Sequence, residues 1–378
     1  MNILHIIPNL SKGGAERLTL DIVRELNSRK GINVKLVLFR DEIEYNISDL
    51  KDLITIIPSR IELSMWKKNQ TYVEALQAFI DEFKPDIIHS HLFEAEIVSR
   101  SCTYPKSTWF SHGHSNMVQF NRKYLKRNGP KVFLTNAYER NYLQKRYKAN
   151  GGNNFIAVSK DTERYLKTHI RNFPVFRLEN AIDFSSFFHQ RSFDNQKLSI
   201  INVGSFQKNK NQQLLVLIAQ QLAARNIDFS IQFLGEGTEQ ENVIQLTKET
   251  NVTSKIEFLG NVSDVQYYLN SATFYVHTAS YEPFGLVLLE AMASGLPVIT
   301  LDGKGNRDII EQGKNGYMIF EEDPALFAEA IVQLWEDKKT YKAISLYAQE
   351  YARQFDIQPY VDKLLMLYNA AISSTNEE

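Results

Sequence analysis

The sequence predicts an α/β protein of two domains, each a doubly wound parallel sheet flanked by helices. With 378 residues, the chain is long enough for two domains of roughly 100–200 residues each. Both halves alternate short apolar runs with longer segments of helical periodicity, the pattern of parallel strands joined by helices. A glycine-containing loop follows the first strand of each half, as in Rossmann-like folds. We expect two such domains facing each other across a cleft.

Composition excludes several classes of protein. Hydrophobic residues make up 43% of the chain, charged residues 23%, and the net charge is −1, so nothing marks a nucleic-acid binder. Cys102 is the only cysteine, which excludes an intramolecular disulfide and disfavours a cysteine-based metal site. The first residues resemble a strand rather than a signal peptide, and no apolar run approaches the roughly 20 residues that span a bilayer. We therefore expect a cytoplasmic protein.

The first half begins with a strand, a glycine loop, a helix and a second strand, predicted at Ile3–Ile7, Pro8–Gly14, Ala15–Ser28 and Asn33–Phe39. Gly13 and Gly14 have no side chain to keep a ligand away, and the helix start adds N–H donors. The loop therefore suits a diphosphate, although a tight turn also needs glycine. The dinucleotide fingerprint G-x-G-x-x-G is absent, which removes the main support for NAD binding.

Histidines gather around two later strands of this half. We expect a helix, then four strands, at Tyr72–Phe83, Ile87–His91, Ser107–Ser115, Phe155–Ser159 and Val175–Leu178. Because ligands lie outside the carboxyl ends of such strands, His112 can reach a sugar hydroxyl or a leaving group, or can be a hydrogen-bonded structural residue. His89 and His91 share one strand face, so metal binding is conceivable, but no carboxylate pattern completes a site. We interpret His89, His91 and His114 as structural.

The segment Asn121–Lys148 is unusually basic, since Glu139 is its only acid. Tyrosines and leucines are interleaved with its cations, which are Arg122, Lys123, Lys126, Arg127, Lys131, Arg140, Lys145, Arg146 and Lys148. Such a segment can lie on an anionic membrane surface, at about 1 kcal/mol per well-placed cation. It can equally be the solvated face of a helix.

The second half repeats the alternation after a linker predicted at residues 184–197. The expected domains are residues 1–183 and 198–357, and a final helix over 358–378 is expected to cross back to the first domain. The predicted strands are Ser199–Val203, Phe229–Leu234, Ile256–Leu259, a run within Ala272–Ser280, Pro297–Leu301 and Tyr317–Phe320. Helices are predicted at Asn211–Arg225, Glu239–Thr250, Val265–Asn270 and Asn306–Gln312, with further helices to the end.

Two glutamates stand on either side of a predicted helix start within Tyr281–Gly295. Glu282 should lie on the loop at the carboxyl end of a strand. Pro283 suits the first turn of a helix whose pattern begins at Phe284. Glu290 should then lie about two turns into that helix. Alternatively, Glu282 caps the helix and Glu290 is solvated.

Two further features of this half favour an anionic ligand. The free N–H groups of Phe284, Gly285 and Leu286 would point at a group bound at the helix start. After the first strand of this half, Gly204 opens room and Lys210 stands at the next helix start. Lysine is a mobile point charge that suits phosphate, although the same lysine can simply be solvated.

These residues resemble glycosyltransferase family 4, which has the GT-B fold. Glu282 and Glu290, with Pro283-Phe284-Gly285 between them, are similar to the family's E-x7-E motif. Further segments occur in the family's order: Gly13–Glu16, Lys84–His89, Ser111–Gly113, Ala157–Ser159, Asn180–Asp183, Gln207–Asn211, Phe233–Gly237, Phe258–Gly260 and Gly295–Ile299. The resemblance covers nearly the whole chain.

The resemblance implies transfer of a hexose or N-acetylhexosamine from a nucleotide diphosphate sugar, UDP-linked by preference, with retention of configuration. The donor would bind mainly to the C-terminal domain. The acceptor, a glycan or a lipid-linked sugar of a bacterial-type surface polysaccharide, would bind mainly to the N-terminal one. The sequence contains no D-x-D triplet, the usual metal-holding motif of other glycosyltransferases. We expect no metal and no other cofactor.

The resemblance also implies roles for single residues. Glu290 would bind the ribose hydroxyls, and Glu282 would lie near the donor sugar. His112 would contact that sugar and support catalysis, while Lys210 would hold the diphosphate. The matching donor-loop and base-binding positions are Gly13, Gly14 and Val262.

Two positions depart from the family pattern. Ser205, after Gly204, replaces an arginine that usually clamps the diphosphate, and Lys208 is a nearby basic residue that can substitute for it. Ala181 replaces the usual glycine of an N-G-I-D-like segment. Two alternatives to the transferase stay open: a nucleotide-sugar epimerase or phosphorylase on the same scaffold, and a non-catalytic protein that binds sugar nucleotides.

Overall fold

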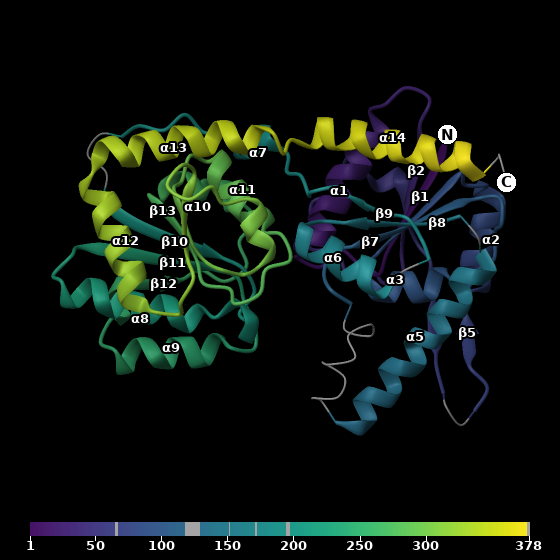
Figure 1. The fold of residues 1–378 in the computed structure, drawn as a ribbon, viewed down its shortest axis with the longest axis horizontal. Coiled ribbons are helices and arrows are strands. Elements are labelled where there is room, and N and C mark those ends of the chain that lie inside the picture. Colours follow the sequence, from purple (N-terminus) through teal and green to yellow (C-terminus); the bar gives the residue numbers. More distant parts are fainter. Residues whose placement is uncertain (65–66, 118–128, 151, 171, 194–196, 376–378) are drawn as a thin grey trace. The chain divides into compact units, whose positions relative to one another are not determined.

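The computed structural model describes residues 1–64, 67–117, 129–150, 152–170, 172–193 and 197–375. The chain forms two compact units. Unit 1 consists of Met1–Asn180 together with Ile357–Glu378, and unit 2 is Ala181–Asp356. Each contains a parallel sheet with helices packed on it (Figure 1), so the predicted α/β class is confirmed.

The sheet of unit 1 has seven parallel strands in the order β3-β2-β1-β6-β7-β8-β9. The strands are β1 (Asn2–Ile7), β2 (Asn33–Leu38), β3 (Ile54–Ile56), β6 (Ile87–His91), β7 (Thr108–Gly113), β8 (Asn153–Ala157) and β9 (Val175–Arg177). The strand order reverses between β1 and β6, which makes their carboxyl ends the topological switch point of this sheet. The register places His5 opposite His89 and His91 opposite His112.

Helices cover both faces of this sheet. They are α1 (Gly14–Asn27), α2 (Glu74–Phe83), α3 (Leu92–Ser99), α5 (Pro130–Asn150), α6 (Lys160–His169) and α14 (Ile357–Thr375), beside a small antiparallel pair, β4 (Arg60–Glu62) and β5 (Gln70–Tyr72). The C-terminal helix α14 packs along α1 (Figure 1), where an Arg29 nitrogen lies 2.9 Å from an Asp362 oxygen. It also reaches the sheet, since the Tyr368 hydroxyl lies 2.5 Å from His89 Nδ1.

Unit 2 repeats this architecture with six parallel strands in the order β12-β11-β10-β13-β14-β15. The strands are β10 (Leu198–Val203), β11 (Phe229–Leu234), β12 (Ile256–Phe258), β13 (Phe274–His277), β14 (Val298–Leu301) and β15 (Gly316–Ile319). The helices are α7 (Phe184–Phe187), α8 (Gln212–Ala224), α9 (Gln240–Glu249), α10 (Val265–Ser271), α11 (Leu286–Ala293), α12 (Pro324–Glu336) and α13 (Lys338–Arg353). The strand order reverses between β10 and β13, the strand that leads to Glu282.

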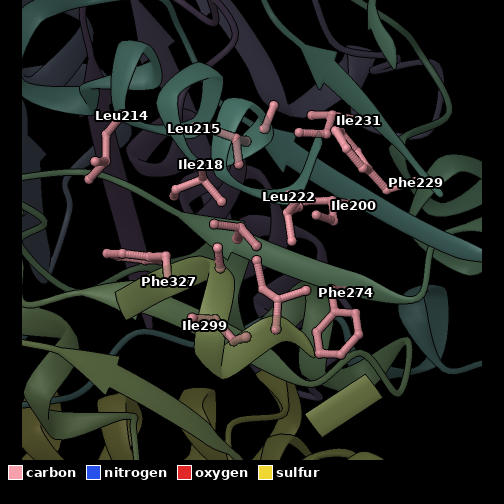
Figure 2. Close-up of a cluster of buried hydrophobic side chains, with 14 of the residues drawn as sticks. Ile200, Leu214, Leu215, Ile218, Leu222, Phe229, Ile231, Phe274, Ile299 and Phe327 are labelled. Carbon is pink, nitrogen blue, oxygen red and sulfur yellow. The ribbon is translucent and has the colours of Figure 1, made fainter. Parts of the chain in front are cut away.

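Apolar periodicity explains why unit 2 folds in this way. Figure 2 shows Leu215, Ile218 and Leu222 of α8, which recur at helical spacing and belong to one buried cluster with Ile200 of β10 and Ile299 of β14. All five side chains are fully buried. The sheet and its helices thus form a rigid base that fixes where the loops after the strands begin.

Three local features differ from what the sequence predicts. Helix α3 was not expected, because no turn residue separates it from β6; the chain turns at Leu92, which has a φ of 67°. The helix predicted at Asn306–Gln312 is only the short 3₁₀ turn Gly305–Asp308, where the buried Asn306 amide donates to Leu301 O and Thr300 Oγ1. Residues 184–197, expected as a linker, contain α7 and belong to unit 2.

The basic segment lies largely on α5. Lys131, Lys145 and Lys148 of this helix are exposed, while Arg146 is half-buried and donates to the Tyr142 hydroxyl at 3.1 and 3.0 Å. The predicted cations Arg122, Lys123, Lys126 and Arg127 lie outside the described residues. Nowhere in the described ranges is a helix both long and apolar enough to span a bilayer.

Candidate active site

Glu282 occupies the loop after β13, as the sequence predicts, but the helix behind it begins later than expected. Helix α11 starts at Leu286, preceded by Gly285 with a φ of 106°. This left-handed conformation cannot continue a helix, and a Cβ at Gly285 would lie 2.9 Å from a Leu288 side-chain carbon. Pro283 therefore precedes the helix instead of forming its first turn. Glu290 lies just over one turn into α11, not two.

The carboxylate of Glu282 is buried, with 7% of the residue exposed, and it is held by two side chains. Lys210 Nζ donates to Oε2 at 2.7 Å, and His277 Nε2 lies 3.1 Å from the same oxygen. Burial alone would raise the pKa of Glu282. The Lys210 charge and the hydrogen bond from His277 outweigh it and lower this pKa to about 2. Glu282 is therefore a fixed negative charge at neutral pH.

His277 was not singled out from the sequence. It is the last residue of β13, fully buried, and burial lowers its pKa despite the opposing effect of Glu282. A neutral imidazole here donates from Nε2 to Glu282, while Nδ1 lies 3.4 Å from the Tyr275 hydroxyl. The one signal in the sequence was that His277 is a polar residue within an apolar strand run. The spacing along the chain gave no reason to expect that it contacts Glu282.

Glu290 influences the Tyr275 hydroxyl, as Glu282 does. It is half-buried on α11. The pKa of the Tyr275 hydroxyl is raised well above its usual range, first by burial and further by the negative charges of Glu282 and Glu290. Both glutamates therefore act on one side chain of β13.

The start of α11 offers donors to an anion. Across the part of the chain that the structure describes, the backbone N–H groups of Phe284, Gly285 and Leu286 have no hydrogen-bond partner. The loop that follows β14 is bonded to the same segment, because Gly305 N donates to Glu282 O at 3.0 Å. With the helix dipole, these groups form a site of positive potential beside a fixed carboxylate.

The other predicted donor-binding residues of unit 2 lie on loops after neighbouring strands. Lys210 ends the short 3₁₀ turn Lys208–Lys210, just before Asn211 caps α8. Ser205 is exposed, and its carbonyl accepts from Gln212 Nε2 at 3.0 Å. Gly204 precedes it, with open space where a Cβ would lie. Val262 is half-exposed on the loop after β12.

In unit 1, the glycine loop is tied to a neighbouring segment. Gly13 N donates to the Tyr45 hydroxyl at 3.0 Å, and that hydroxyl donates to Gly13 O at 2.9 Å. Helix α1 begins at the next residue, Gly14, without a side-chain cap. The N–H of Gly13 is thus already used, and the start of α1 supplies the remaining donors of this loop.

His112 ends the histidine series of unit 1. It lies in β7 with 1% exposed, and neither ring nitrogen has a hydrogen-bond partner among the described residues. Burial, reinforced by neighbouring histidines, lowers its pKa well below the usual value. A neutral imidazole with both nitrogens available can donate to, or accept from, a sugar hydroxyl.

The pair of Lys210 and Glu282 makes the stability of unit 2 dependent on pH. Because the pKa of Glu282 is lowered from 4.5 to about 2, its ionised form stabilises the fold above about pH 4.5. This contribution is lost as pH falls towards 2. Lys210→Met should lower the free energy of unfolding by about 2 kcal/mol at pH 7, and the deficit should shrink at pH 3.5. Urea unfolding followed by Trp335 fluorescence, with Trp66 and Trp109 replaced by phenylalanine, measures this.

Lys208→Met is the matched control, because Lys208 is exposed on the same 3₁₀ turn. It should leave the unfolding free energy unchanged at both pH values. An equal loss in both variants, or a Lys210→Met deficit that is the same at pH 3.5, would contradict the ion-pair interpretation.

Comparison with known families matches almost the whole chain in two parts. The family model described as Glycosyltransferase Family 4 matches residues 12–186, and that described as Glycosyl transferases group 1 matches residues 183–351. The first ends, and the second begins, next to the boundary between the two units.

Relatives from bacteria carry transferase names. The chain is 26% identical over 203 residues to the putative glycosyltransferase EpsD of Bacillus subtilis, covering 54% of this chain and 53% of EpsD. It thus spans about half the length of that relative. A full-length relative is the N-acetylgalactosamine-N,N'-diacetylbacillosaminyl-diphospho-undecaprenol 4-alpha-N-acetylgalactosaminyltransferase of Campylobacter jejuni. It is 23% identical, with coverage of 93% of this chain and 94% of the relative.

Solved structures share the fold. Anabaena HepE, crystallised with UDP and glucose, superimposes with a TM-score of 0.76 at 18% identity over 97% of this chain and 99% of HepE. WaaG, a glycosyltransferase of lipopolysaccharide biosynthesis, gives 0.73 at 16% identity over 96% and 98% of the two chains. The chain therefore belongs to glycosyltransferase family 4 and has the GT-B fold.

Proposed function

We propose that this protein is a retaining glycosyltransferase that moves a hexose or N-acetylhexosamine from a UDP-sugar to a glycan or lipid-linked acceptor. The observation that carries the proposal is the buried, ionised Glu282, held by Lys210 beside the unpartnered N–H groups at the start of α11. Such a site combines one fixed negative charge with several donors, as a sugar diphosphate requires. Family membership supports it.

Lys210 has the chemistry to stabilise the leaving diphosphate. When the bond from sugar to phosphate breaks, negative charge grows on the phosphate and positive charge on the sugar. An ammonium group has three donors, so Lys210 can keep its bond to Glu282 and still donate to phosphate oxygens. The Glu282 carboxylate, fixed nearby, then stabilises the positive charge that develops on the sugar.

The remaining residues have proposed roles in binding. Glu290 accepts hydrogen bonds from the ribose hydroxyls, and Val262 contacts the base. Gly204 leaves room for the diphosphate beside Ser205, whose short side chain provides no charge in place of the family's arginine. Lys208, exposed on the same loop, is the cation available to compensate.

We assign two further roles to unit 1. Neutral His112 donates to a hydroxyl of the donor sugar and supports transfer, which its unpartnered ring nitrogens permit. We assign Gly13 and Gly14 to the donor-binding loop, where the start of α1 supplies N–H groups; a carboxylate oxygen of Glu16 occupies the space where a Cβ of Gly13 would lie. The acceptor binds mainly to this unit.

We propose that transfer needs no metal ion. Other glycosyltransferases stabilise the negative charge of the leaving diphosphate with a metal held by D-x-D. Here Lys210 and the N-terminus of α11 stabilise that charge instead. The lysine ammonium lies 2.7 Å from Glu282, so a cation already stands beside the proposed reaction centre.

We propose that the acceptor is bound to a membrane and that the protein acts on it from the cytoplasmic face. The Campylobacter jejuni relative is named for an acceptor linked to diphospho-undecaprenol. On α5, exposed Val132 and Leu134 stand next to Lys131, and Lys145 and Lys148 are exposed further along. Apolar and cationic side chains on one helix suit an anionic membrane surface.

The function is tested first with a panel of nucleotide sugars in EDTA. One donor, UDP-linked, should raise the melting temperature and release UDP slowly by hydrolysis, because the site binds the diphosphate without metal. Interconversion of the free donor without release would indicate an epimerase instead. Binding without turnover, even with added acceptors, would favour the non-catalytic alternative.

Two single variants separate binding from chemistry. Glu290→Ala should raise KM for the donor about tenfold or more through loss of the ribose contacts, since a hydrogen bond to a charged group contributes about 1.5–3 kcal/mol. His112→Ala should lower kcat by about 100-fold and change KM little. Steady-state kinetics with the identified donor measures both. Normal turnover in His112→Ala would remove that residue from the catalytic set.

Membrane contact is tested with vesicles of anionic and neutral lipids. Replacing Lys131, Lys145 and Lys148 with glutamine should weaken partition onto anionic vesicles by about 100-fold, at about 1 kcal/mol per cation. The matched control replaces three exposed lysines of unit 2, Lys248, Lys314 and Lys339. Equal sedimentation of the α5 variant and the wild type would exclude this surface as the anchor.

A further inference from the structure

Five histidines from three adjacent strands gather on one face of the unit 1 sheet. They are His5 of β1, His89 and His91 of β6, His112 of β7, and His114 just after it. Neighbouring rings lie close, with centroids 4.1 Å apart for His112 and His114 and 4.5 Å for His89 and His91. Tyr368 of α14 contacts the deep end of the cluster, at His89.

The cluster satisfies only part of its own hydrogen-bonding capacity. His5 Nδ1 lies 2.8 Å from His91 Nε2, and His91 Nδ1 lies 2.9 Å from His114 Nε2. Within the described residues, His5 Nε2, His89 Nε2 and both nitrogens of His112 are buried without a partner. Buried polar atoms without partners are rare because each costs free energy. Such a concentration indicates a ligand that accepts lone pairs.

We propose that His91, His112 and His114 bind a divalent transition-metal ion of the Zn²⁺ class. One ring nitrogen from each lies within 4.8 Å of the others. A tetrahedral zinc ion, with Zn–N bonds of about 2.0–2.1 Å, needs nitrogens about 3.4 Å apart. Small ring rotations therefore close the site. Three imidazoles with no carboxylate among them are a donor set that suits Zn²⁺, Ni²⁺ or Cu²⁺ rather than Mg²⁺ or Ca²⁺.

Access distinguishes this triad from the alternative one, His5, His89 and His91, whose nitrogens are also within 4.8 Å of one another. All three of those residues are fully buried, and the Tyr368 hydroxyl already occupies His89 Nδ1. His114 is half-exposed and lies just beyond the carboxyl end of β7. An ion can enter there, and a fourth coordination position remains for water.

The neighbours of the triad prepare it for a metal. His5 contacts the second ring nitrogen of His91 and so fixes the orientation of that ring, as outer-shell partners of metal ligands do.

A bound ion would have a consequence for transfer, which rests on the proposed function. His112 would give one ring nitrogen to the metal and keep only the other for a hydrogen bond, with its ring orientation fixed by the ion rather than by the donor sugar. The ion would therefore inhibit the enzyme, reversibly and with relief by EDTA. This role is separate from the metal-independent transfer reaction, because the ion would sit on a catalytic side chain rather than on the diphosphate.

Binding is tested without any sugar donor, on the untagged full-length protein freed of metal. Titration with Co²⁺ should give the intense visible absorption of a tetrahedral complex, and Zn²⁺ should displace it. His114→Asn and His112→Asn should each weaken Co²⁺ binding by about 100-fold or more, since each loses a ligand. His169→Asn is the matched control, because His169 of α6 lies outside the cluster and stacks on Tyr165.

The outcomes separate the site from the activity. Circular dichroism and melting temperature confirm that each variant is folded. A substitution at His114 should disturb folding least, because this histidine is partly exposed at the edge of the cluster. Unchanged Co²⁺ binding in folded His114→Asn overturns the proposal, as does binding abolished by His5→Asn but retained by His114→Asn. Weakening by His169→Asn equal to that by His114→Asn would show only surface binding and also overturn it. Zn²⁺ bound without inhibition would keep the site and contradict the role of His112 in transfer.

Discussion

A buried carboxylate is the constraint on which the ligand-binding end of unit 2 depends. Glu282 is ionised in the interior, which is costly unless cations and donors surround it. Lys210 and His277 provide them at 2.7 and 3.1 Å. The loops that carry these groups are bonded in turn, since Thr278 Oγ1 donates to Lys210 O at 3.0 Å and Glu282 N to Gly303 O at 2.8 Å. One charge thus fixes three loops that follow β10, β13 and β14.

The same arrangement is what a sugar diphosphate would require. A site that stabilises charge separation works best when its dipoles and charges are oriented before the ligand arrives. Here the ammonium of Lys210, the carboxylate of Glu282 and the N–H groups of α11 are held by the fold itself. The left-handed Gly285 matters for this reason, because it lets the chain turn into α11 with those N–H groups unpaired.

Unit 1 shows what happens when polar residues occupy strand positions that face a helix. His89 and His91 share a face through the period of two within a strand, the register places His112 opposite His91, and Tyr368 of α14 contacts His89. Their ring nitrogens form only some of the hydrogen bonds available to them, so this face retains nitrogens that can bind a ligand. The proposed sugar contact of His112 and the proposed metal site both draw on its two unpartnered ring nitrogens, so an ion bound to one nitrogen leaves only the other for the sugar.

The sequence by itself determined the α/β class and the bounds of β6 and β11, because these follow from local periodicity. It also predicts the pairing of Glu282 with Glu290, from a motif within one segment. Tertiary structure decided the contact of His277 with Glu282, the late start of α11 and the meeting of five histidines. Periodicity fixes the face on which a residue lies in its own strand. Which strands become neighbours depends on the order of the whole sheet, and contacts across that order cannot be read from spacing along the chain.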